Sequence, residues 1–174
     1  MKETLAIINA MQRDGVIGKY AIGGAVGATH YLEPAATLDI DIFVVLPSSE
    51  SSQLIHLSPL YEYLKARGGV EKQEHIVIGG WPVQFLAPSN DLERDAVAEA
   101  IRADVEGVPT WIMPAQHLVA IALNTGRVKD QLRVLRFFEE KAVNVDKLEE
   151  LLARHGLSAK WQRFKEKYPE AALG

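Results

Sequence analysis

The sequence predicts an α+β protein: a small mixed sheet with flanking helices, followed by a C-terminal helical bundle. Short β-branched and aromatic runs alternate with amphipathic segments in residues 1–113, whereas residues 114–174 carry helical patterns only. Such segregation of the helices is typical of α+β domains. Hydrophobic residues make up 48% of the 174 positions, which is enough for a packed core. We expect a core domain at 1–113 and a helical region at 114–174 that packs on it.

The first part of the chain is expected to begin with a helix that packs on the core. Leu5, Ile8 and Met11 recur at helical spacing, and Gly15 stops the run. Further on, Ser58 begins a helix because a serine followed by proline is typical of an N-cap. In order, the expected elements are a helix at 3–13, a strand at 20–22, a helix at 25–31, a strand at 39–46, a polar loop at 47–52 and a helix from 58 that ends at Gly68.

The second part is expected to complete the sheet and then to continue as helices. A Gly-Gly-Trp-Pro turn at 79–82 indicates a β-hairpin. Leu92, Val97 and Ile101 form the inner face of an amphipathic helix. The expected elements are strands at 74–78 and 83–86, a helix at 91–104, a strand at 110–113, and helices at 115–124, 127–141, 146–155 and 159–168. The helix at 115–124 is mostly apolar, so we expect it to be buried.

The composition excludes several classes of protein. The sequence has no cysteine, so it can form neither a disulfide nor a thiolate metal site. No apolar run approaches the roughly 18 residues of a membrane span. The first 15 residues, MKETLAIINAMQRDG, are too polar for a signal peptide. We therefore expect a cytoplasmic protein with no membrane partner.

Charge is distributed unevenly along the chain. Residues 1–126 contain 8 basic and 15 acidic residues, and residues 127–174 contain 11 basic and 8 acidic residues, which together give the net charge of −4. A basic C-terminal part favours polyphosphate or RNA, but its small excess is also compatible with a solvated helical surface. The sequence shows no basic patch interleaved with aromatic residues, as RNA-binding surfaces have.

The stretch 20–46 carries the clearest functional pattern. Asp39 and Asp41 lie two residues apart in an expected strand, so both side chains point to the same face. Neighbouring carboxylates repel each other and favour a hard cation such as Mg²⁺, although the solvent face of an edge strand is the alternative. Gly23 and Gly24 permit positive φ and a close approach of backbone to ligand, at a helix start that favours phosphate. Together these residues predict a metal–nucleotide site.

This pattern resembles a known protein family. Gly23-Gly24, a short helix and Thr37-x-Asp39-x-Asp41 on a strand are similar to the nucleotidyltransferase superfamily that includes DNA polymerase β. Within that superfamily the sequence resembles most the small bacterial members, the AbiEii/AbiGii-type toxin nucleotidyltransferases and their relatives. The resemblance implies that the sheet and its flanking helices form a minimal nucleotidyltransferase core.

Two later segments extend the resemblance, which covers about residues 5–140. Segment 81–86 (WPVQFL) falls where the family has the strand of its third carboxylate. Segment 126–130 (GRVKD) resembles the helix-start motif after the core, where Arg127 and Lys129 would contact the triphosphate or the base. Many bacterial members also carry a lysine one helical turn earlier, which this chain lacks.

The resemblance implies metal-dependent transfer of NMP from an NTP to a protein, tRNA or small-molecule acceptor, with Mg²⁺ or Mn²⁺ as the cofactor. It also implies a toxin–antitoxin role with an antitoxin-like partner. The implied metal ligands are Asp39 and Asp41, and the implied nucleotide-binding residues are Gly23, Gly24, Thr37, Arg127 and Lys129. The alternatives are an ordinary loop residue at Thr37 and surface charge at the two basic positions.

Gln84 occupies the third catalytic position and departs from the family pattern. The family has Asp or Glu there, whereas glutamine carries no charge and is no base at neutral pH. Either another acid such as Glu71 or Glu74 substitutes, or the protein is a catalytically impaired module that binds nucleotide or a partner protein. A purely structural interaction domain is a third alternative. The five histidines show no ligand spacing.

Overall fold

The computed structural model describes residues 1–34, 37, 39–47 and 57–169, and it contains a seven-stranded mixed sheet in the order β3-β4-β5-β2-β1-β7-β6. The strands are β1 (Tyr20–Ile22), β2 (Ile40–Val44), β3 (Val70–Lys72), β4 (His75–Ile78), β5 (Trp81–Leu86), β6 (Ile101–Val105) and β7 (Val108–Ile112). The helices are α1 (Lys2–Arg13), α2 (Gly24–Ala28), α3 (Ser58–Lys65), α4 (Asp91–Ala98), α5 (Ala115–Thr125), α6 (Val128–Glu139), α7 (Val145–Arg154) and α8 (Ser158–Lys167). This is the α+β architecture that the sequence predicts.

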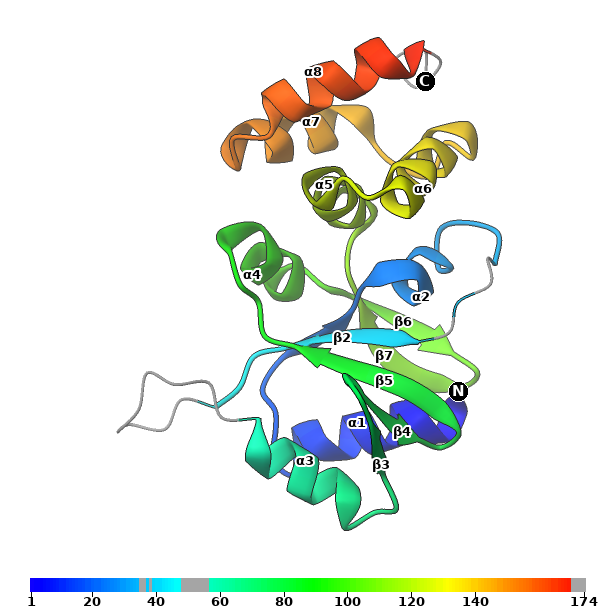
Figure 1. Ribbon diagram of the computed structural model, residues 1–174, viewed down its shortest axis with the longest axis vertical. Helices are drawn as coiled ribbons and strands as arrows, with labels where there is room; N and C mark the ends of the chain where they lie inside the picture. Colours follow the sequence, from blue (N-terminus) through cyan, green and yellow to red (C-terminus); the bar gives the residue numbers. More distant parts are fainter. Residues whose placement is uncertain (35–36, 38, 48–56, 170–174) are drawn as a thin grey trace.

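Helices cover both faces of the sheet (Figure 1). Helices α1 and α3 lie on one face, and α2, α4 and the C-terminal helices lie on the other. On the first face, α1 buries Leu5, Ile8 and Met11 completely, as its periodicity predicts. None of the helices that the structure describes combines the length and the apolar character needed to span a bilayer.

Strand β2 lies at the centre of the sheet. It pairs antiparallel with β1 and parallel with β5, and this register places Asp41 directly beside Gln84. Ile40, Ile42 and Val44 point to the face covered by α1 and α3 and are fully buried. Because side chains alternate along a strand, Asp41 points to the opposite face, toward the helices that follow the sheet in sequence.

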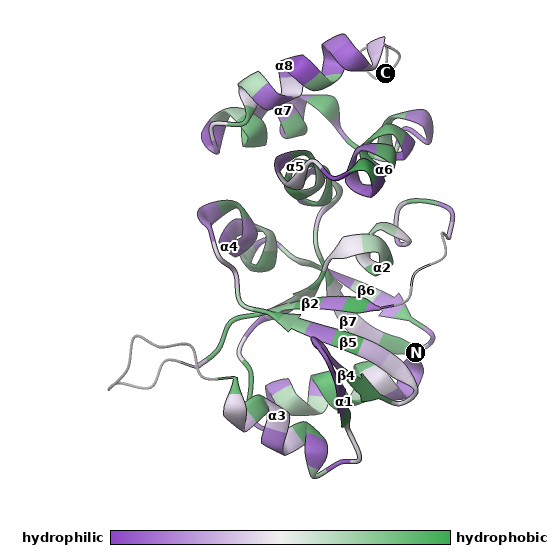
Figure 2. Cartoon of the chain, viewed as in Figure 1, coloured by the Kyte–Doolittle hydropathy of each residue, from purple (hydrophilic) through white to green (hydrophobic). Residues whose placement is uncertain are grey.

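The C-terminal region packs on the sheet through α5, which is apolar and almost entirely buried (Figure 2). Helix α5 contacts α2, α4, α6, α7 and α8, and it shares one hydrophobic cluster with Phe43 of the sheet. Trp161 of α8 stacks between Phe138 and Phe164, at ring-centroid distances of 5.2 and 5.8 Å. Since α5 joins the sheet to the other three C-terminal helices, it fixes the position of α6 over the strands.

The helix expected at 91–104 is wrong in its second half. Helix α4 ends at Ala98, and the following residues form β6, which pairs with β7 as a hairpin. The turn of this hairpin consists of Glu106 and Gly107, which both have positive φ (54° and 79°). Two-residue turns of this kind match the twist of paired strands, so sheet pairing outweighs the amphipathic pattern. Ile101, which was expected to point inward, is consequently 38% exposed.

Other element boundaries also differ from expectation. Helix α2 ends at Ala28, so the helix expected at 25–31 is shorter, and the edge strand β3 was not expected. Leu132 of α6 is 56% exposed although it is a large hydrophobic residue. The loop expected at 47–52 lies outside the described residues from position 48 onward.

Candidate functional site

The acidic end of the candidate site lies at the start of β2. Asp41 pairs in register with Gln84 on β5. Asp39 lies just before the strand, and its Oδ2 is 3.2 Å from Nε2 of His75 on β4. Thr37 donates its hydroxyl hydrogen bond to the backbone carbonyl of Asp39 at 3.2 Å. The structure therefore places Asp41 beside Gln84 and Asp39 beside His75, a histidine to which the sequence analysis gave no role.

A side chain at either glycine of the turn would collide with a neighbouring side chain. Gly24 has φ of +57°, and a Cβ there would lie 1.9 Å from Oδ2 of Asp41. A Cβ on Gly23 would lie 2.8 Å from the ring of Phe43, and the Gly23 N–H donates to the carbonyl of Asp41 at 2.9 Å. The turn thus brings backbone and carboxylate into direct contact. Because α2 has only five residues, its dipole is small, and the turn itself is the main backbone feature of the site.

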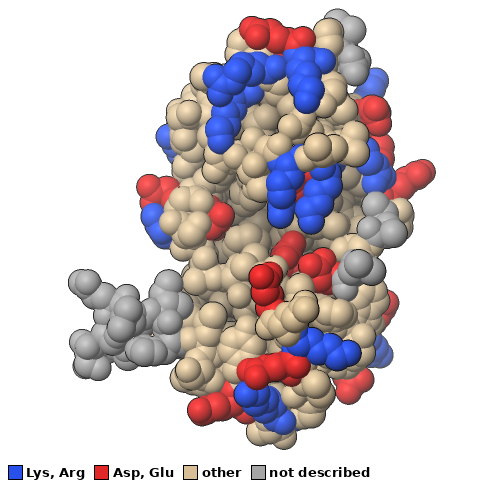
Figure 3. All heavy atoms as spheres, viewed as in Figure 1, with Lys and Arg blue, Asp and Glu red and all other residues tan. Residues whose placement is uncertain are grey.

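The basic end of the site comes from α6. Burial raises the pKa of the Asp41 carboxyl, and the Asp39 carboxylate raises it further, whereas Arg133, Lys129 and Arg127 lower it. The charges of the strand and of the helix therefore act on the same space. Figure 3 shows basic side chains gathered over α6, with acidic side chains over the sheet below them in this view.

One cavity of about 310 Å³ connects the two ends. Its lining includes Gly24, Asp41, Gln84, Arg127 and Lys129, which are five of the eight site residues that the sequence singles out. Gly23, Thr37 and Asp39 do not line it. The fold thus collects residues that are up to 105 positions apart in the sequence (24 and 129) in one hollow above β2.

Arg127 and Lys129 differ in their roles within the fold. Asp130 is only 1% exposed, and it accepts from Arg127 Nε at 2.6 Å and from Arg133 Nη1 at 3.3 Å. Hydrogen bonding to Asp130 raises the pKa of Arg127. Lys129 forms no ion pair within 4.0 Å in the part of the chain that the structure describes. Arg127 is therefore partly structural, whereas the charge of Lys129 is available to a ligand.

A second hollow adjoins the first. This groove between α2 and α6, of about 410 Å³, shares Ala25, Lys129 and Arg133 with the cavity. Its other lining residues are Ala28, Thr29, Leu32, Glu33, Thr37, Leu132 and Arg136. Apolar walls with a cationic rim suit an anionic molecule that has an apolar body. The exposure of Leu132 is thus part of a groove rather than an isolated surface feature.

Neither acid that was expected to replace the missing carboxylate is in reach of the site. Glu71 pairs in register with Ile76, on the opposite face of the sheet from Asp41, and it forms an ion pair with Lys65 at 3.0 Å. Glu74 lies in the exposed turn between β3 and β4. Besides Asp41 and Asp130, the acid that lines the cavity is Glu93 of α4. The sequence shows it only as part of a helix-capping pattern, Asn90-x-x-Glu93, which carries no functional signal by itself.

The oxygen atoms of the site suit a divalent cation. Asp39, Asp41 and the amide oxygen of Gln84 are all hard donors of the kind that Mg²⁺ prefers. Within residues 1–34, 37, 39–47 and 57–169, no three His, Asp or Glu side chains lie close enough together to hold a metal ion. These residues alone would supply only part of the coordination of a cation, and other oxygen atoms would have to supply the rest. The repulsion from Asp39 and the burial that disfavour a charged Asp41 would both be relieved by such a cation.

The fold is similar to that of solved nucleotidyltransferase-like proteins. An antigenic nucleotidyltransferase-like protein from Paracoccidioides brasiliensis matches with a TM-score of 0.62 and 13% identity, over 99% of this chain and 91% of that one. The antibiotic-resistance factor ANT(2'')-Ia matches in its solution structure with a TM-score of 0.51 and 14% identity, over 96% of both chains. Its crystal structure with adenylyl-2''-tobramycin matches with a TM-score of 0.52 and 15% identity, over 91% of this chain and 94% of that one. No protein-family model and no curated protein sequence matches this chain. At these identities the likeness concerns the fold.

Proposed function

We propose that this protein transfers a nucleotidyl group from an NTP to an acceptor, with Mg²⁺ or Mn²⁺ as the cofactor. The observation that supports this function best is the single cavity in which Asp41, Gly24 and the cations of α6 meet. The carboxylate would attract the cation of a metal triphosphate, and the arginine and lysine on the opposite side would attract its phosphates. The nucleotidyltransferase-like fold of the neighbouring structures agrees with this reading.

Each end of the cavity has its own role in this proposal. Asp39 and Asp41 would hold the cation, which when bound neutralises charge on the triphosphate. Lys129 and Arg127 hold phosphate oxygens from the opposite side, and Arg127 is kept in place by Asp130. The backbone at Gly24 lets the phosphate approach the carboxylate without a side chain between them. Holding both reactants in this geometry lowers the entropic part of the barrier.

The groove between α2 and α6 extends this site, and we place the nucleoside there. Its walls of Ala28, Leu32 and Leu132 give a flat base an apolar surface, and Arg136 gives its polar edge a donor. Lys129 and Arg133 line both hollows, so a triphosphate in the cavity is continuous with a base in the groove. Thr37 would contact the nucleotide from the groove side.

The acceptor is a hydroxyl of a protein, a tRNA or a small molecule. The crystal structure of ANT(2'')-Ia contains adenylyl-2''-tobramycin, which favours a small molecule by analogy of fold alone. The resemblance to AbiEii/AbiGii-type toxins favours instead a role beside an antitoxin-like partner. In either case we propose that residues 1–113 supply the metal ligands and residues 114–174 the phosphate-binding cations.

The alternative is a module of the same fold that binds nucleotide or a partner protein without catalysis. Gln84 favours it, because a neutral amide beside Asp41 leaves the site with one charged ligand fewer than the family pattern.

Thermal stability with ATP, with and without Mg²⁺, tests the shared part of both functions. At 100 times Kd a ligand stabilises by about 2.7 kcal/mol, which for a chain of this size raises Tm by about 5–11 °C. We expect this shift only when Mg²⁺ is present, and we expect Asp41→Asn to remove it. Release of labelled pyrophosphate from γ-labelled ATP then separates the enzyme from the binding module. A Tm that ATP and Mg²⁺ leave unchanged would reject both.

A further inference from the structure

Glu93 is the one glutamate that lines the cavity, within the part of the chain that the structure describes. It lies in the first turn of α4 and shares the lining with Asp41 and Gln84. Its side chain is half-buried, and no Lys, Arg or His lies within 4.0 Å of its carboxylate among the described residues. The cavity lining therefore includes a glutamate without an ion-pair partner, together with Gln84, which supplies no charge.

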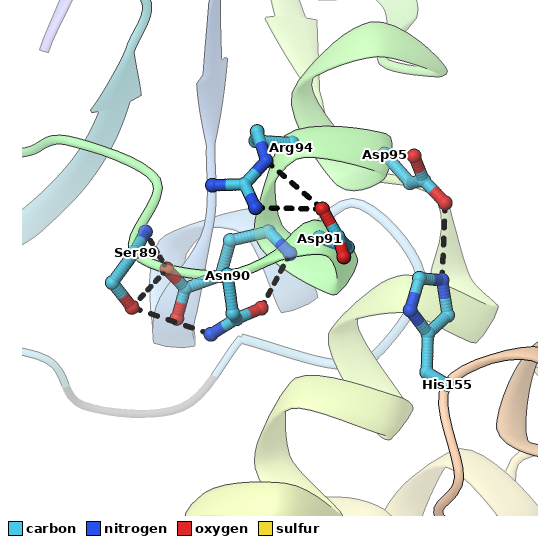
Figure 4. Close-up of polar contacts among 7 residues, drawn as sticks. Ser89, Asn90, Asp91, Arg94, Asp95 and His155 are labelled. Atoms are coloured by element: carbon cyan, nitrogen blue, oxygen red, sulfur yellow. Dashed lines mark hydrogen bonds and ion pairs between the residues drawn. The ribbon is translucent and has the colours of Figure 1, made fainter.

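Two hydrogen bonds fix this carboxylate by one oxygen only. Oε2 accepts from the backbone N–H of Ser89 at 2.6 Å and from its hydroxyl at 2.8 Å. The Glu93 N–H in turn donates to Oδ1 of Asn90 at 3.0 Å. Figure 4 shows Ser89 and Asn90 at the start of α4. Among the described residues Oε1 accepts no hydrogen bond, so it is free to accept a proton from a molecule in the cavity.

The other charged residues of the same helix are already paired. Asp91 binds Arg94 at 2.6 Å, and Asp95 lies 3.0 Å from Nε2 of His155 (Figure 4). These pairs are directed toward solvent or toward α7, and none of their members lines the cavity. Glu93 is therefore distinguished from its neighbours by having a fixed carboxylate, a free oxygen and access to the site.

We propose that Glu93 is the general base that takes over the role left open by Gln84. The proposal rests on the nucleotidyl transfer argued above. In the step, the acceptor oxygen forms a bond to the α-phosphorus while its proton passes to Oε1 of Glu93. The bond between the α-phosphorus and the bridging oxygen breaks, and pyrophosphate leaves with the electron pair. Glu93 then returns the proton to water.

Helix capping alone is the competing explanation for Glu93, and one substitution separates the two. Glutamine at this position also serves in a capping box, because its amide oxygen accepts the same hydrogen bonds. Glu93→Gln therefore keeps the cap and removes the base. Asp91→Asn is the matched control, since it removes one negative charge from the same helical turn at a side chain that is 82% exposed.

The experiment measures pyrophosphate release from Mg·ATP, with water or the protein's own hydroxyl groups as acceptor, together with Tm and the Mg·ATP-induced shift in Tm. We expect Glu93→Gln to keep both thermal values and to lose about 10²–10⁴-fold in rate, which is the usual contribution of a general base. The double variant Glu93→Gln/Gln84→Glu should recover part of the rate, and Asp91→Asn should match the native protein.

The outcomes keep this inference separate from the proposed function. Native release of pyrophosphate that Glu93→Gln leaves unchanged would overturn the role of Glu93 and leave nucleotidyl transfer standing. Binding of Mg·ATP with no release by the native protein would overturn the transfer reaction and the base together. If Glu93→Gln lowers Tm, Glu93→Asp is measured as well, because aspartate retains a carboxylate. If the rate of pyrophosphate release falls in parallel with Tm in both variants, the proposal is overturned.

Discussion

Substituting Gly24 by alanine should separate the backbone role of the glycine turn from its role at the carboxylate. Gly24 has φ of +57°, in the left-handed region. An L-residue there costs about 1–2 kcal/mol, which for a chain of this size lowers Tm by about 2–8 °C. The new Cβ would lie 1.9 Å from Oδ2 of Asp41. The carboxylate would have to retreat by about 1.5 Å to reach an ordinary contact of 3.4 Å.

This displacement should abolish metal-dependent nucleotide binding. A carboxylate that is displaced by about 1 Å or more no longer lies at the distance needed to hold a cation. We therefore expect Gly24→Ala to lose the Mg·ATP-induced rise in Tm of about 5–11 °C that the native protein should show at 100 times Kd. Differential scanning fluorimetry with and without Mg·ATP measures both effects on one sample.

Gly80→Ala is the matched control for the backbone cost. Gly80 also has positive φ (+82°), in the turn between β4 and β5, but a Cβ there would have no atom within 4 Å. It should lower the apo Tm by a similar amount and leave the Mg·ATP shift intact. If Gly24→Ala bound Mg·ATP as tightly as Gly80→Ala does, the contact between the glycine turn and Asp41 would be irrelevant to the ligand.

Four further substitutions test charged and titratable side chains. Burial and Asp39 raise the pKa of Asp41 above its ordinary value of 3.8, so the stability of the native apo protein should fall as pH rises through that raised pKa. Asp41→Asn should weaken this fall and raise the apo Tm at pH 7, which thermal melts at several pH values would measure. Lys129→Ala should lower ATP affinity and its salt dependence at unchanged Tm, whereas Arg127→Ala should lower affinity and Tm together; titrations at two salt concentrations check both. His117 is fully buried, and neither ring nitrogen has a hydrogen-bond partner among the described residues. Because burial lowers its pKa, the native protein should lose stability as pH falls below 6.5. His117→Leu should flatten that slope and stabilise the protein by about 1 kcal/mol, as measured by urea unfolding.

The pH dependence assigned to His117 depends on the charges that face it. Glu99 lies 3.8 Å from its Nε2, and Asp95 also favours its protonated form. His155 and Arg154 of α7 act in the opposite direction, and burial outweighs all of these charges. A native protein whose stability is constant between pH 7.5 and 5.5 would contradict this assignment.

The sequence predicts those parts of the site whose chemistry is local. Asp39 and Asp41 are recognisable because strand alternation alone places them on one face, and the glycines because they interrupt an apolar run. The pairing of Asp41 with Gln84 also follows once the third-carboxylate strand is identified. These predictions depend on neighbours in sequence or on one strand pair, which are the contacts that a pattern encodes.

The residues that the sequence misses depend on tertiary placement. Glu93 lines the cavity because α4 packs against β2 and α5, a tertiary contact that the expected helix 91–104 did not predict. His75 reaches Asp39 across the width of β5, a contact that no spacing rule contains. Glu71 was named as an acid that could substitute for the missing carboxylate, but the register of β3 places it on the opposite face of the sheet from Asp41.

The division of the site between two regions of the chain has a consequence for protein synthesis. The acidic half is complete once β2 and β5 have paired, but the cations of α6 follow at residues 127–133, after α5 has docked on the sheet. Chains are synthesised from the N-terminus at about 5–20 residues per second. A nascent chain that has emerged only as far as β7 therefore holds two repelling aspartates with no opposing cations. In the proposed function, competence to bind the nucleotide would therefore arise only after α6 has left the ribosome.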